Sequence, residues 1–446
     1  MPATAPHRAL AAFAAGLELA DLPEAVVEKV RCNLLHDLAC AVAAHEVGPS
    51  VWPLVADRRP AEAALLCVGT QVPAEHAAFA NAVLMHARAQ DDTHFAAKCH
   101  AGSAVIPAAL AVAERQGSTG AELVAAVVAG YEVATAVGER LAPAATARGF
   151  RASGILGPLG AAAAAASLLG LDEEGAAHAL ALAASFSAGL NQTWLDGSSE
   201  YRWELGMAAR NGVLAADLAA HGATGAAHAL DGAAGFAAAF AGVPADALDD
   251  LELGRHWRIL DVIYKPYPVC NITQTPVAVA VGIATAHDLQ AADVESVVCA
   301  MHPADRDYPG TLGRAPFTGV GASLMSAPYC IALALRDRTA TLRGLGDYDD
   351  PELVALAGRV TVTADPALPA LAARLQVRTR AGARLEGELI PDAATYGWAW
   401  AGVAANADRL RPEMGPHAAG LDALKAAVRA VDRLPSVTPL LSATEG

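Results

Sequence analysis

The sequence predicts a mainly α-helical protein with two parts, a large all-helical domain and a smaller α+β domain. Two observations support this prediction. Roughly the first 260 residues show helical patterns rich in alanine and glycine, whereas after Tyr267 short β-branched segments alternate with helical ones. With 446 residues, of which 54% are hydrophobic and 17% charged, the chain is long and apolar enough to bury a sizeable ordered core.

The helical part carries three start signals. Residues 21–24 combine an aspartate cap, a proline and an acid at the capping-box position, and they predict a helix that continues to Val42. Thr119 and Glu122 repeat this device before a helix that ends near residue 141, and Asp172 begins a third helix that ends near residue 189. Small side chains let helix axes approach closely, so the alanine run 161–166 is predicted to lie at a tight, buried crossing.

The elements after Tyr267 are of both kinds. Short, partly alternating segments predict strands at 296–301, 359–363, 375–380 and 384–390, with a hairpin turn at 381–382. Helical patterns lie at 275–286, 321–335 and 351–357. These elements predict an α+β domain over residues 265–398 with a mostly antiparallel sheet. The pattern after Trp398 is helical again, so residues 399–446 are expected to complete the helical domain of residues 1–264.

Charge and hydropathy exclude several classes of partner. Lys and Arg number 31 and Asp and Glu number 47, a formal net charge of −16, and no basic stripe suited to a run of phosphates is present, so we expect no nucleic acid partner. The uncharged stretch 152–171 is interrupted by glycines and a proline, so no membrane span is expected. The N-terminus lacks the charged and apolar regions of a secretory signal, so we expect a soluble cytoplasmic protein.

The seven cysteines are scattered, and no two of them form a C-x-x-C pair. This distribution is typical of reduced thiols in a protein core. It favours neither a disulfide framework nor a zinc ribbon, and it argues against an iron–sulfur hydro-lyase.

The densest polar cluster of the sequence lies at residues 90–100, between two apolar stretches. It contains the adjacent Asp91 and Asp92, together with Thr93, a lysine, and two histidines of which the second is His100. Such groups are costly to bury without a function, although a solvated loop would explain them equally well. The two histidines lack helical i, i+4 spacing, so no metal site is expected.

Two further clusters offer candidate residues. Arg202, within residues 200–204, is suited to bind a substrate carboxylate through two hydrogen bonds, although an ion pair with a neighbouring glutamate explains it at least as well. Lys265 and Cys270 lie at the predicted domain junction, where clefts form, although a lone lysine there is more often solvated. The chain has no Walker motif, no G-x-G-x-x-G and no G-x-S-x-G, so neither a nucleotide site nor a serine-nucleophile elbow is indicated.

Taken together, several segments resemble the MmgE/PrpD family nearly end to end. Their order and spacing carry the resemblance, and they lie at residues 81–86, 91–94, 100–107, 130–133, 157–163, 208–212, 265–268 and 327–329. The resemblance implies a large helical domain joined to a smaller α+β lid domain, a homodimer, and a metal-free cleft for small polycarboxylates. By position, the pocket elements of the family correspond here to Asp92, Thr93, His100 and Lys265.

The chain also departs from its relatives. An aspartate that commonly begins the acidic motif is replaced here by Ala89, and a histidine is replaced by Arg151. A lysine and a histidine of the relatives fall on Tyr201 and Glu204, and a histidine that some members carry falls on Cys270. These departures predict a divergent subgroup with a different substrate.

The resulting hypothesis is a cofactor-independent hydro-lyase that removes water from a small or tailoring-pathway hydroxy (poly)carboxylate after proton abstraction next to a carboxylate. His100 is expected to be the general base or acid, Asp92 to orient it or share its proton, and Tyr201 to assist proton transfer. Lys265 and Arg202 are expected to bind carboxylate. The residues expected to contact the substrate are Asp91, Thr93, Arg151 and Cys270. An isomerase or epimerase, a decarboxylase, or a non-catalytic ligand-binding relative remain alternatives.

Overall fold

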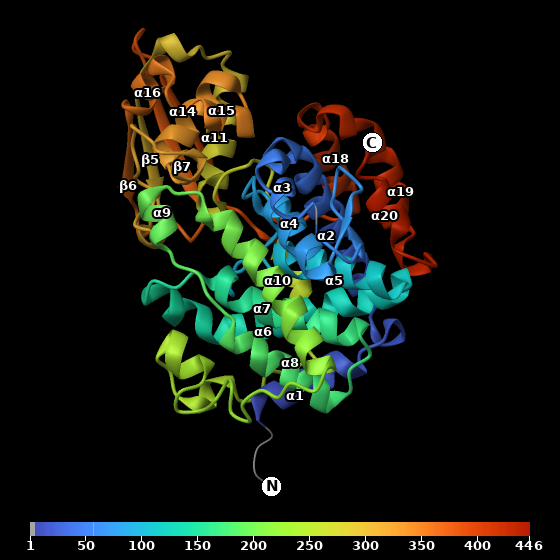
Figure 1. The fold of residues 1–446 in the computed structure, drawn as a ribbon. Coiled ribbons are helices and arrows are strands. Elements are labelled where there is room, and N and C mark those ends of the chain that lie inside the picture. The colour runs from blue at the N-terminus through green and yellow to red at the C-terminus, as the bar shows by residue number, and fades with distance from the viewer. Residues whose placement is uncertain (1–4, 57) are drawn as a thin grey trace.

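The computed structural model describes residues 5–56 and 58–446. As predicted, it is mainly α-helical, with a smaller α+β part (Figure 1). The main helices of the larger part are α1 (Pro6–Gly16), α2 (Glu24–Ala43), α3 (Trp52–Val55), α4 (Ala74–His86), α5 (Gly102–Gln116), α6 (Gly120–Ala147), α7 (Ala152–Leu168), α8 (Glu173–Ser185), α9 (Gln192–Asp196) and α10 (Glu200–Ala220). Two short antiparallel pairs join β1 (Ala63–Ala64) to β2 (Gln71–Val72) and β3 (Thr93–His94) to β4 (Val262–Ile263).

Helix α7 lies at the centre of the larger part and packs against α5, α6, α8 and α10. Its alanine run 161–166 is at most 1% exposed, which confirms the predicted tight crossing. Glycine makes these approaches possible: a Cβ atom on Gly160 would lie 2.7 Å from the carbonyl oxygen of Gly130 on α6. On the other side of α7, a Cβ atom on Gly212 of α10 would lie 2.3 Å from the Cβ of Ala161. The small residues therefore set the spacing of the central helices.

Helix α6 is long and apolar enough to cross a bilayer by length and composition. However, 89% of its most apolar window is buried inside the fold. It also carries the buried Glu132, whose carboxylate accepts a hydrogen bond from the backbone nitrogen of Ile259 at 2.9 Å. The position of α6 among the other helices is therefore that of a core helix.

The smaller part contains a sheet of four strands in the order β6-β5-β7-β8. Strand β5 runs parallel to β6 and antiparallel to β7, and β7 pairs antiparallel with β8, so the sheet is mostly antiparallel as predicted. Helices α11 and α14 pack against the sheet. The elements are α11 (Gln274–Ala286), β5 (Val294–Met301), α12 (Pro303–Arg306), α13 (Val320–Met325), α14 (Ala327–Asp337), α15 (Leu342–Gly346), α16 (Pro351–Ala357), β6 (Val360–Ala364), β7 (Ala373–Thr379), β8 (Arg384–Leu389) and α17 (Ala393–Tyr396).

The last helices return to the larger part. They are α18 (Trp400–Leu410), α19 (Leu421–Arg429) and α20 (Thr438–Ser442). Both α18 and α19 contact α2, and Figure 1 shows these red helices beside the blue N-terminal ones. Their buried residues Val403, Leu424 and Leu440 belong to the same hydrophobic cluster as α2 and α7, whereas the residues that cover the four-stranded sheet form a second cluster.

The helix ends confirm some start signals and correct others. Thr119 and Glu122 form the predicted capping box, and Asp172 caps α8 by accepting from the backbone nitrogen of Gly175 at 2.9 Å. The capping box predicted at residues 21–24 is wrong, because the carboxylate of Asp21 accepts instead from the backbone nitrogen of Glu18. The single helix predicted at 321–335 is two helices, separated at Ser326, whose hydroxyl caps α14. Helix α8 ends at residue 185, earlier than predicted, and α6 continues to residue 147.

Candidate functional site

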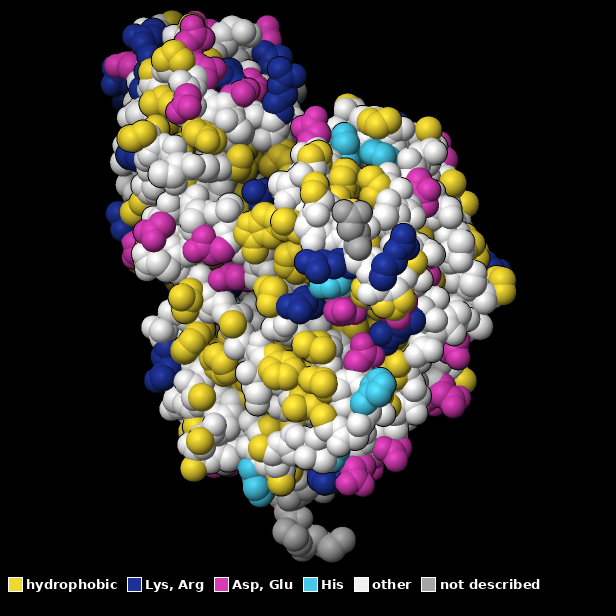
Figure 2. Space-filling model, viewed as in Figure 1, with side chains coloured by type: hydrophobic (Ala, Val, Ile, Leu, Met, Phe, Trp, Pro, Cys, Tyr) yellow, Lys and Arg dark blue, Asp and Glu magenta, His cyan; other side chains and the backbone are white. Residues whose placement is uncertain are grey.

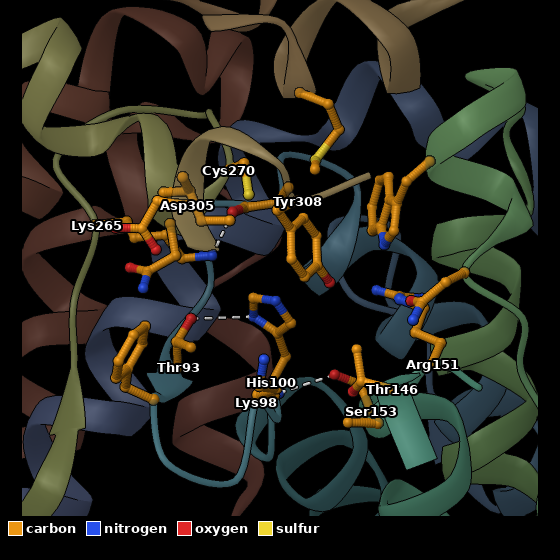
Figure 3. A pocket seen from close by; sticks show the side chains of 18 of the residues that line it. Thr93, Lys98, His100, Thr146, Arg151, Ser153, Lys265, Cys270, Asp305 and Tyr308 are labelled. Atoms are coloured by element: carbon orange, nitrogen blue, oxygen red, sulfur yellow. Dashed lines mark hydrogen bonds between the residues drawn. The ribbon is translucent and has the colours of Figure 1, made fainter. Parts of the chain in front are cut away.

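A cavity of about 340 Å³ lies where the larger part, the junction segment and the α+β part meet. Figure 2 shows a furrow between the smaller lobe and the helical body, and Figure 3 shows the cavity itself. The larger part contributes Thr93, Phe95, Lys98, His100, Thr146, Arg151, Ser153, Asn191 and Trp194; the junction contributes Lys265, Cys270, Asn271 and Ile272; the α+β part contributes His302, Asp305, Tyr308, Leu324 and Met325. Five of the nine predicted site residues line this cavity, namely Thr93, His100, Arg151, Lys265 and Cys270.

The pairing of β3 with β4 brings two of the predicted clusters together. Thr93 lies opposite Ile263 in this short antiparallel ladder. The segment 90–100 therefore lies beside the chain that leads to Lys265, although about 170 residues separate them in sequence. Gln90 strengthens the junction, because its side-chain nitrogen donates to the carbonyl oxygens of Lys265 and Pro266 at 3.1 and 3.0 Å.

His100 precedes α5 and presents its ring to the cavity (Figure 3). Its backbone nitrogen donates to the hydroxyl of Ser153 at 3.0 Å. Its ring nitrogen Nδ1 lies 2.9 Å from the carbonyl oxygen of Asp92 and 3.2 Å from the hydroxyl of Thr93. A carbonyl oxygen can only accept, so Nδ1 carries the proton and Nε2 of the neutral ring has a free lone pair. Burial, and then the charge of Lys265, lower the pKa of His100 well below its ordinary value, so the ring is neutral near pH 7.

Asp91 faces the histidines. Its Oδ2 accepts from His86 Nδ1 at 2.8 Å and from the hydroxyl of Ser103 at 2.5 Å, and it lies 3.4 Å from His100 Nδ1. Burial alone would raise the pKa of Asp91, but His86, His100 and Lys265 together hold it well below its ordinary value. The carboxylate is therefore a fixed negative charge behind the two imidazole rings.

Asp92 points the other way, into the core. Its Oδ2 accepts from the hydroxyl of Tyr131 at 2.5 Å, and its backbone nitrogen donates to Asp37 at 3.0 Å. Burial and the charge of Asp91 raise the pKa of Asp92 to about 7, and burial raises that of Asp37 well above its ordinary value. The predicted role of Asp92 needs correction: its side chain does not line the cavity, and it touches His100 only through its backbone oxygen.

Arg151 is fixed by three partners at the N-terminus of α7. Its guanidinium donates to Glu204 Oε2 at 2.8 Å, to His86 Nε2 at 2.5 Å and to the carbonyl oxygen of Tyr201. It also lies over the ring of Trp194, with 5.0 Å between the guanidinium carbon and the ring centroid. A continuous chain of hydrogen bonds therefore runs from Glu204 through Arg151 and His86 to Asp91.

Lys265 and Cys270 line the cavity from the junction. The side-chain nitrogen of Lys265 donates to the carbonyl oxygen of Ala89. Burial lowers the pKa of Lys265, whereas the charge of Asp91 opposes this effect. Burial raises the pKa of the Cys270 thiol, so this group is a neutral wall of the cavity and not a thiolate nucleophile.

The structure does not bring Tyr201 and Arg202 to the cavity wall, which corrects two predictions. The hydroxyl of Tyr201 donates to the carbonyl oxygen of Ala87 at 2.9 Å, so it is committed to the fold. Arg202 lies with its guanidinium carbon 5.6 Å from the ring centroid of Trp203. Arg151 is the arginine that lines the cavity in the part of the chain that the structure describes.

Sequence reasoning missed three groups at the site. His86 ends one of the segments that carried the family resemblance. Its pairing with Asp91 becomes visible only in the three-dimensional structure. Asp305 lies in α12 and Tyr308 follows this helix, and both reach the cavity from the α+β part. In Figure 3 the Tyr308 hydroxyl points into the cavity between His100 and Arg151. Burial raises the pKa of Tyr308 to about 12, so this hydroxyl keeps its proton near pH 7.

Among residues 5–56 and 58–446, two groups of metal-binding residue types come together, His86 with Asp91 and His100, and His94 with Glu139 and Asp261. His86 already uses both ring nitrogens, one toward Asp91 and one toward Arg151. His94 accepts from the backbone nitrogen of Ala97 through Nδ1 at 3.2 Å, so its neutral ring carries the proton on Nε2, where a metal would need a lone pair. Neither donor set fits a metal ion as it stands.

Comparison with known proteins gives consistent matches. The sequence profile of the MmgE/PrpD N-terminal domain matches residues 8–247, and that of the MmgE/PrpD C-terminal domain matches residues 267–393. A cis-aconitate decarboxylase of Aspergillus terreus is 26% identical over 376 residues, which cover 78% of this chain and 76% of that protein. A cis-aconitate decarboxylase-like protein, oryM of Aspergillus oryzae, is 29% identical over 220 residues, which cover 47% of this chain and 45% of that protein.

Proposed function

The chain belongs to the MmgE/PrpD family, and on this premise we propose that it is a lyase that needs no cofactor and removes water from a hydroxy carboxylate. The substrate class is a small or tailoring-pathway hydroxy (poly)carboxylate whose hydroxyl is β to the carboxylate. The single observation that carries the proposal is the state of His100: a neutral imidazole at the cavity wall, with its proton held on Nδ1 and its Nε2 lone pair available. Such a group is a general base for a proton next to a carboxylate.

His100 Nε2 takes the proton from the carbon next to the carboxylate, and the C–H electron pair forms the carbon–carbon double bond. The C–O bond to the β-hydroxyl breaks, and the departing hydroxide takes the proton of Tyr308 and leaves as water. The proton then passes from the imidazolium of His100 back to the phenolate of Tyr308, which restores both groups. The products are an unsaturated carboxylate and water.

The charges around His100 support this step. Negative charge grows on the substrate carboxylate as the proton leaves, and Lys265 and Lys98 line the cavity with ammonium groups that can stabilise it. Asp91 stabilises the imidazolium that forms, because it lies 3.4 Å from His100 Nδ1 and remains ionised. Asp91, not Asp92, therefore takes the orienting role in the proposed mechanism.

A decarboxylase is the second candidate. It is favoured by the names of the curated relatives, which are a cis-aconitate decarboxylase and a cis-aconitate decarboxylase-like protein. The same base and cations would serve that reaction, with carbon dioxide leaving in place of hydroxide. An epimerase would use the proton abstraction alone.

The test is to incubate the protein with hydroxy acids and unsaturated acids in deuterated water and to follow the products by mass spectrometry. Loss of water supports the dehydratase, release of carbon dioxide supports the decarboxylase, and deuterium in an otherwise unchanged substrate supports an epimerase. Thermal stabilisation without any of these would indicate a non-catalytic relative.

Replacing the base completes the test. His100→Gln is expected to lower turnover by roughly 10²-fold or more, because a general base is lost. His76→Gln on α4, outside the cavity, is the matched control and should keep normal turnover. Near-normal turnover of the His100 variant would remove the proposed mechanism.

A further inference from the structure

Residues 88–90 follow α4 and lead into the acidic segment that begins at Asp91. Arg88 and Gln90 are fully buried, and their side chains bond to each other, because Nε of Arg88 donates to Oε1 of Gln90 at 3.1 Å. Ala89 lies between them with a φ of +49°, in the left-handed region that residues other than glycine seldom adopt. A backbone in this conformation persists only where its surroundings fix it, and the two flanking side chains supply that support.

This short segment contacts Lys265 at both its side chain and its backbone. Nζ of Lys265 donates to the carbonyl oxygen of Ala89. In the opposite direction, the side-chain nitrogen of Gln90 donates to the carbonyl oxygens of Lys265 and Pro266 at 3.1 and 3.0 Å. Lys265 lies in the cavity wall (Figure 3), whereas Gln90 lies behind it. The position of the lysine therefore depends on a residue that does not line the cavity.

Arg88 in turn is fixed by the C-terminal segment. Its guanidinium donates to the two carboxylate oxygens of Glu413 at 3.0 and 2.9 Å, and to the carbonyl oxygen of Ala43 at 3.3 Å. Glu413 also accepts from the backbone nitrogen of Leu342 at 3.2 Å, and Leu342 is the first residue of α15 in the α+β part. Glu413 therefore bonds to both parts of the chain that enclose the cavity, and its bidentate pair with Arg88 fixes direction as well as charge.

A buried ion pair adds little stability compared with well-packed apolar side chains, because both charges lose their hydration. The effect of the pair at this position is directional: Arg88 holds the amide of Gln90 so that its donors face the junction. On the basis of the proposed function, in which Lys265 binds the substrate carboxylate, we propose that Gln90 is a positioning residue for Lys265. Arg88 and Glu413 keep Gln90 oriented, and all three act from outside the cavity wall.

Isothermal titration calorimetry with propane-1,2,3-tricarboxylate, which has no hydroxyl group to lose, measures how well the site binds carboxylate. Gln90→Met keeps the length of the side chain and removes its hydrogen bonds, so the dissociation constant should rise by about tenfold. Misfolding of part of the sample would lower the binding stoichiometry and leave the dissociation constant unchanged. The dissociation constant therefore separates a positioning role from a merely structural one.

Asn81→Leu is the matched control. Asn81 is also a buried amide, on α4, and its side-chain nitrogen donates to the carbonyl oxygen of Ala64 at 3.0 Å. Its loss should lower stability and leave the dissociation constant unchanged. Should Gln90→Met not fold, Glu413→Gln takes its place, because it weakens the pair with Arg88 and should raise the dissociation constant by about threefold.

A double-mutant cycle tests whether Gln90 acts through Lys265. In a Lys265→Met background, which lacks the ammonium group, Gln90→Met should change the dissociation constant by less than about twofold. Complete loss of binding in Lys265→Met would itself show that this lysine binds the carboxylate, and the comparison of Gln90→Met with Asn81→Leu then decides.

Four results would overturn the proposal: an unchanged dissociation constant in folded Gln90→Met, an equal rise in Asn81→Leu, an equal rise in the Lys265→Met background, or no binding of the probe to the wild-type protein. Turnover decides the lyase function separately. The expected shifts without turnover of any hydroxy acid would remove the lyase and keep Gln90 as a positioning residue of a carboxylate site. Turnover with an unchanged dissociation constant in Gln90→Met would do the reverse.

Discussion

Asp91 and Asp92 are neighbours in the sequence, yet one faces the cavity histidines and the other faces the core. On the cavity side, Asp91 accepts from His86 and Ser103 and lies 3.4 Å from His100 Nδ1. On the core side, Asp92 accepts from Tyr131 and donates through its backbone nitrogen to Asp37. Both carboxyl groups are fully buried, so burial alone does not distinguish them.

The groups that surround each carboxylate cause the difference between the pKa values of Asp91 and Asp92. Imidazole and ammonium groups hold the pKa of Asp91 well below its ordinary value, although burial opposes them. The carboxyl group of Asp37 lies next to Asp92. Burial, together with the charge of Asp91, raises the pKa of Asp92 to about 7. The cavity side therefore holds a permanent negative charge that supports proton transfer, whereas the core side holds two buried carboxyl groups whose pKa values are raised.

The largest effect that this comparison predicts is on turnover in Asp91→Asn. The amide cannot stabilise an imidazolium, so kcat/KM is expected to fall by roughly 10²-fold or more, as for the orienting carboxylate of a general base. Asp92→Asn should cost less than about tenfold, because its side chain does not contact His100.

Steady-state kinetics of both variants, with thermal unfolding to exclude misfolding, provide the measurement. If Asp92→Asn loses as much activity as Asp91→Asn while folding normally, the two sides are not functionally distinct, and Asp92 regains the role that the sequence suggested.

The second prediction concerns how the stability of the protein depends on pH through Asp37 and Asp92 on the core side. Asp92 has a pKa of about 7 in the fold against an ordinary value of 3.8, and the pKa of Asp37 is raised as well, chiefly by burial. A raised carboxyl pKa gives stability that is fully present below the unfolded value and is lost as pH rises through the folded value. Stability should therefore fall by an amount on the order of 1–4 kcal/mol between about pH 4 and pH 7 through Asp92.

Asp37→Asn removes one acid of the pair and should flatten this dependence, as followed by urea unfolding across the pH range. Asp246→Asn, at an exposed position, is the control and should keep the wild-type slope. An unchanged slope in Asp37→Asn would show that this carboxyl group does not contribute to the pH dependence of stability.

Much of the fold follows from local signals in the sequence. The capping box at Thr119 and the turn at Gly382, whose φ is +86°, mark element ends that the structure confirms. The break before α14 was also encoded, because Ser326 caps a helix whose second residue is Pro328, but the apolar pattern continued across it. The capping pattern at Asp21 failed because Pro23 occupies the N-cap position of α2.

The site could be predicted only in part, because side-chain direction and domain packing are not local properties. Tyr201 and Arg202 are adjacent on α10, so they point about 100° apart, and the sequence cannot say which of them faces inward. Tyr308 and Asp305 lie about 200 residues after His100, and only the packing of the α+β part places them at the same cavity. The segments near residues 92 and 265 were found because their composition is unusual in an alanine-rich chain, and Arg151 was found through the family resemblance.

The smallest predicted effect is that of Arg202→Ala on kcat/KM. Its comparison with Arg151→Ala tests which of the two arginines acts at the cavity. Arg202→Ala should change kcat/KM by less than about threefold, because its guanidinium lies over Trp203 and not at the cavity. Loss of this contact should cost no more than about 1 kcal/mol of stability. Arg151→Ala should lower kcat/KM by at least about tenfold, because it leaves His86 Nε2 without its donor and breaks the chain that ends at Asp91. Equal losses of kcat/KM in the two variants would mean that Arg202 reaches the substrate after all, as the sequence first suggested.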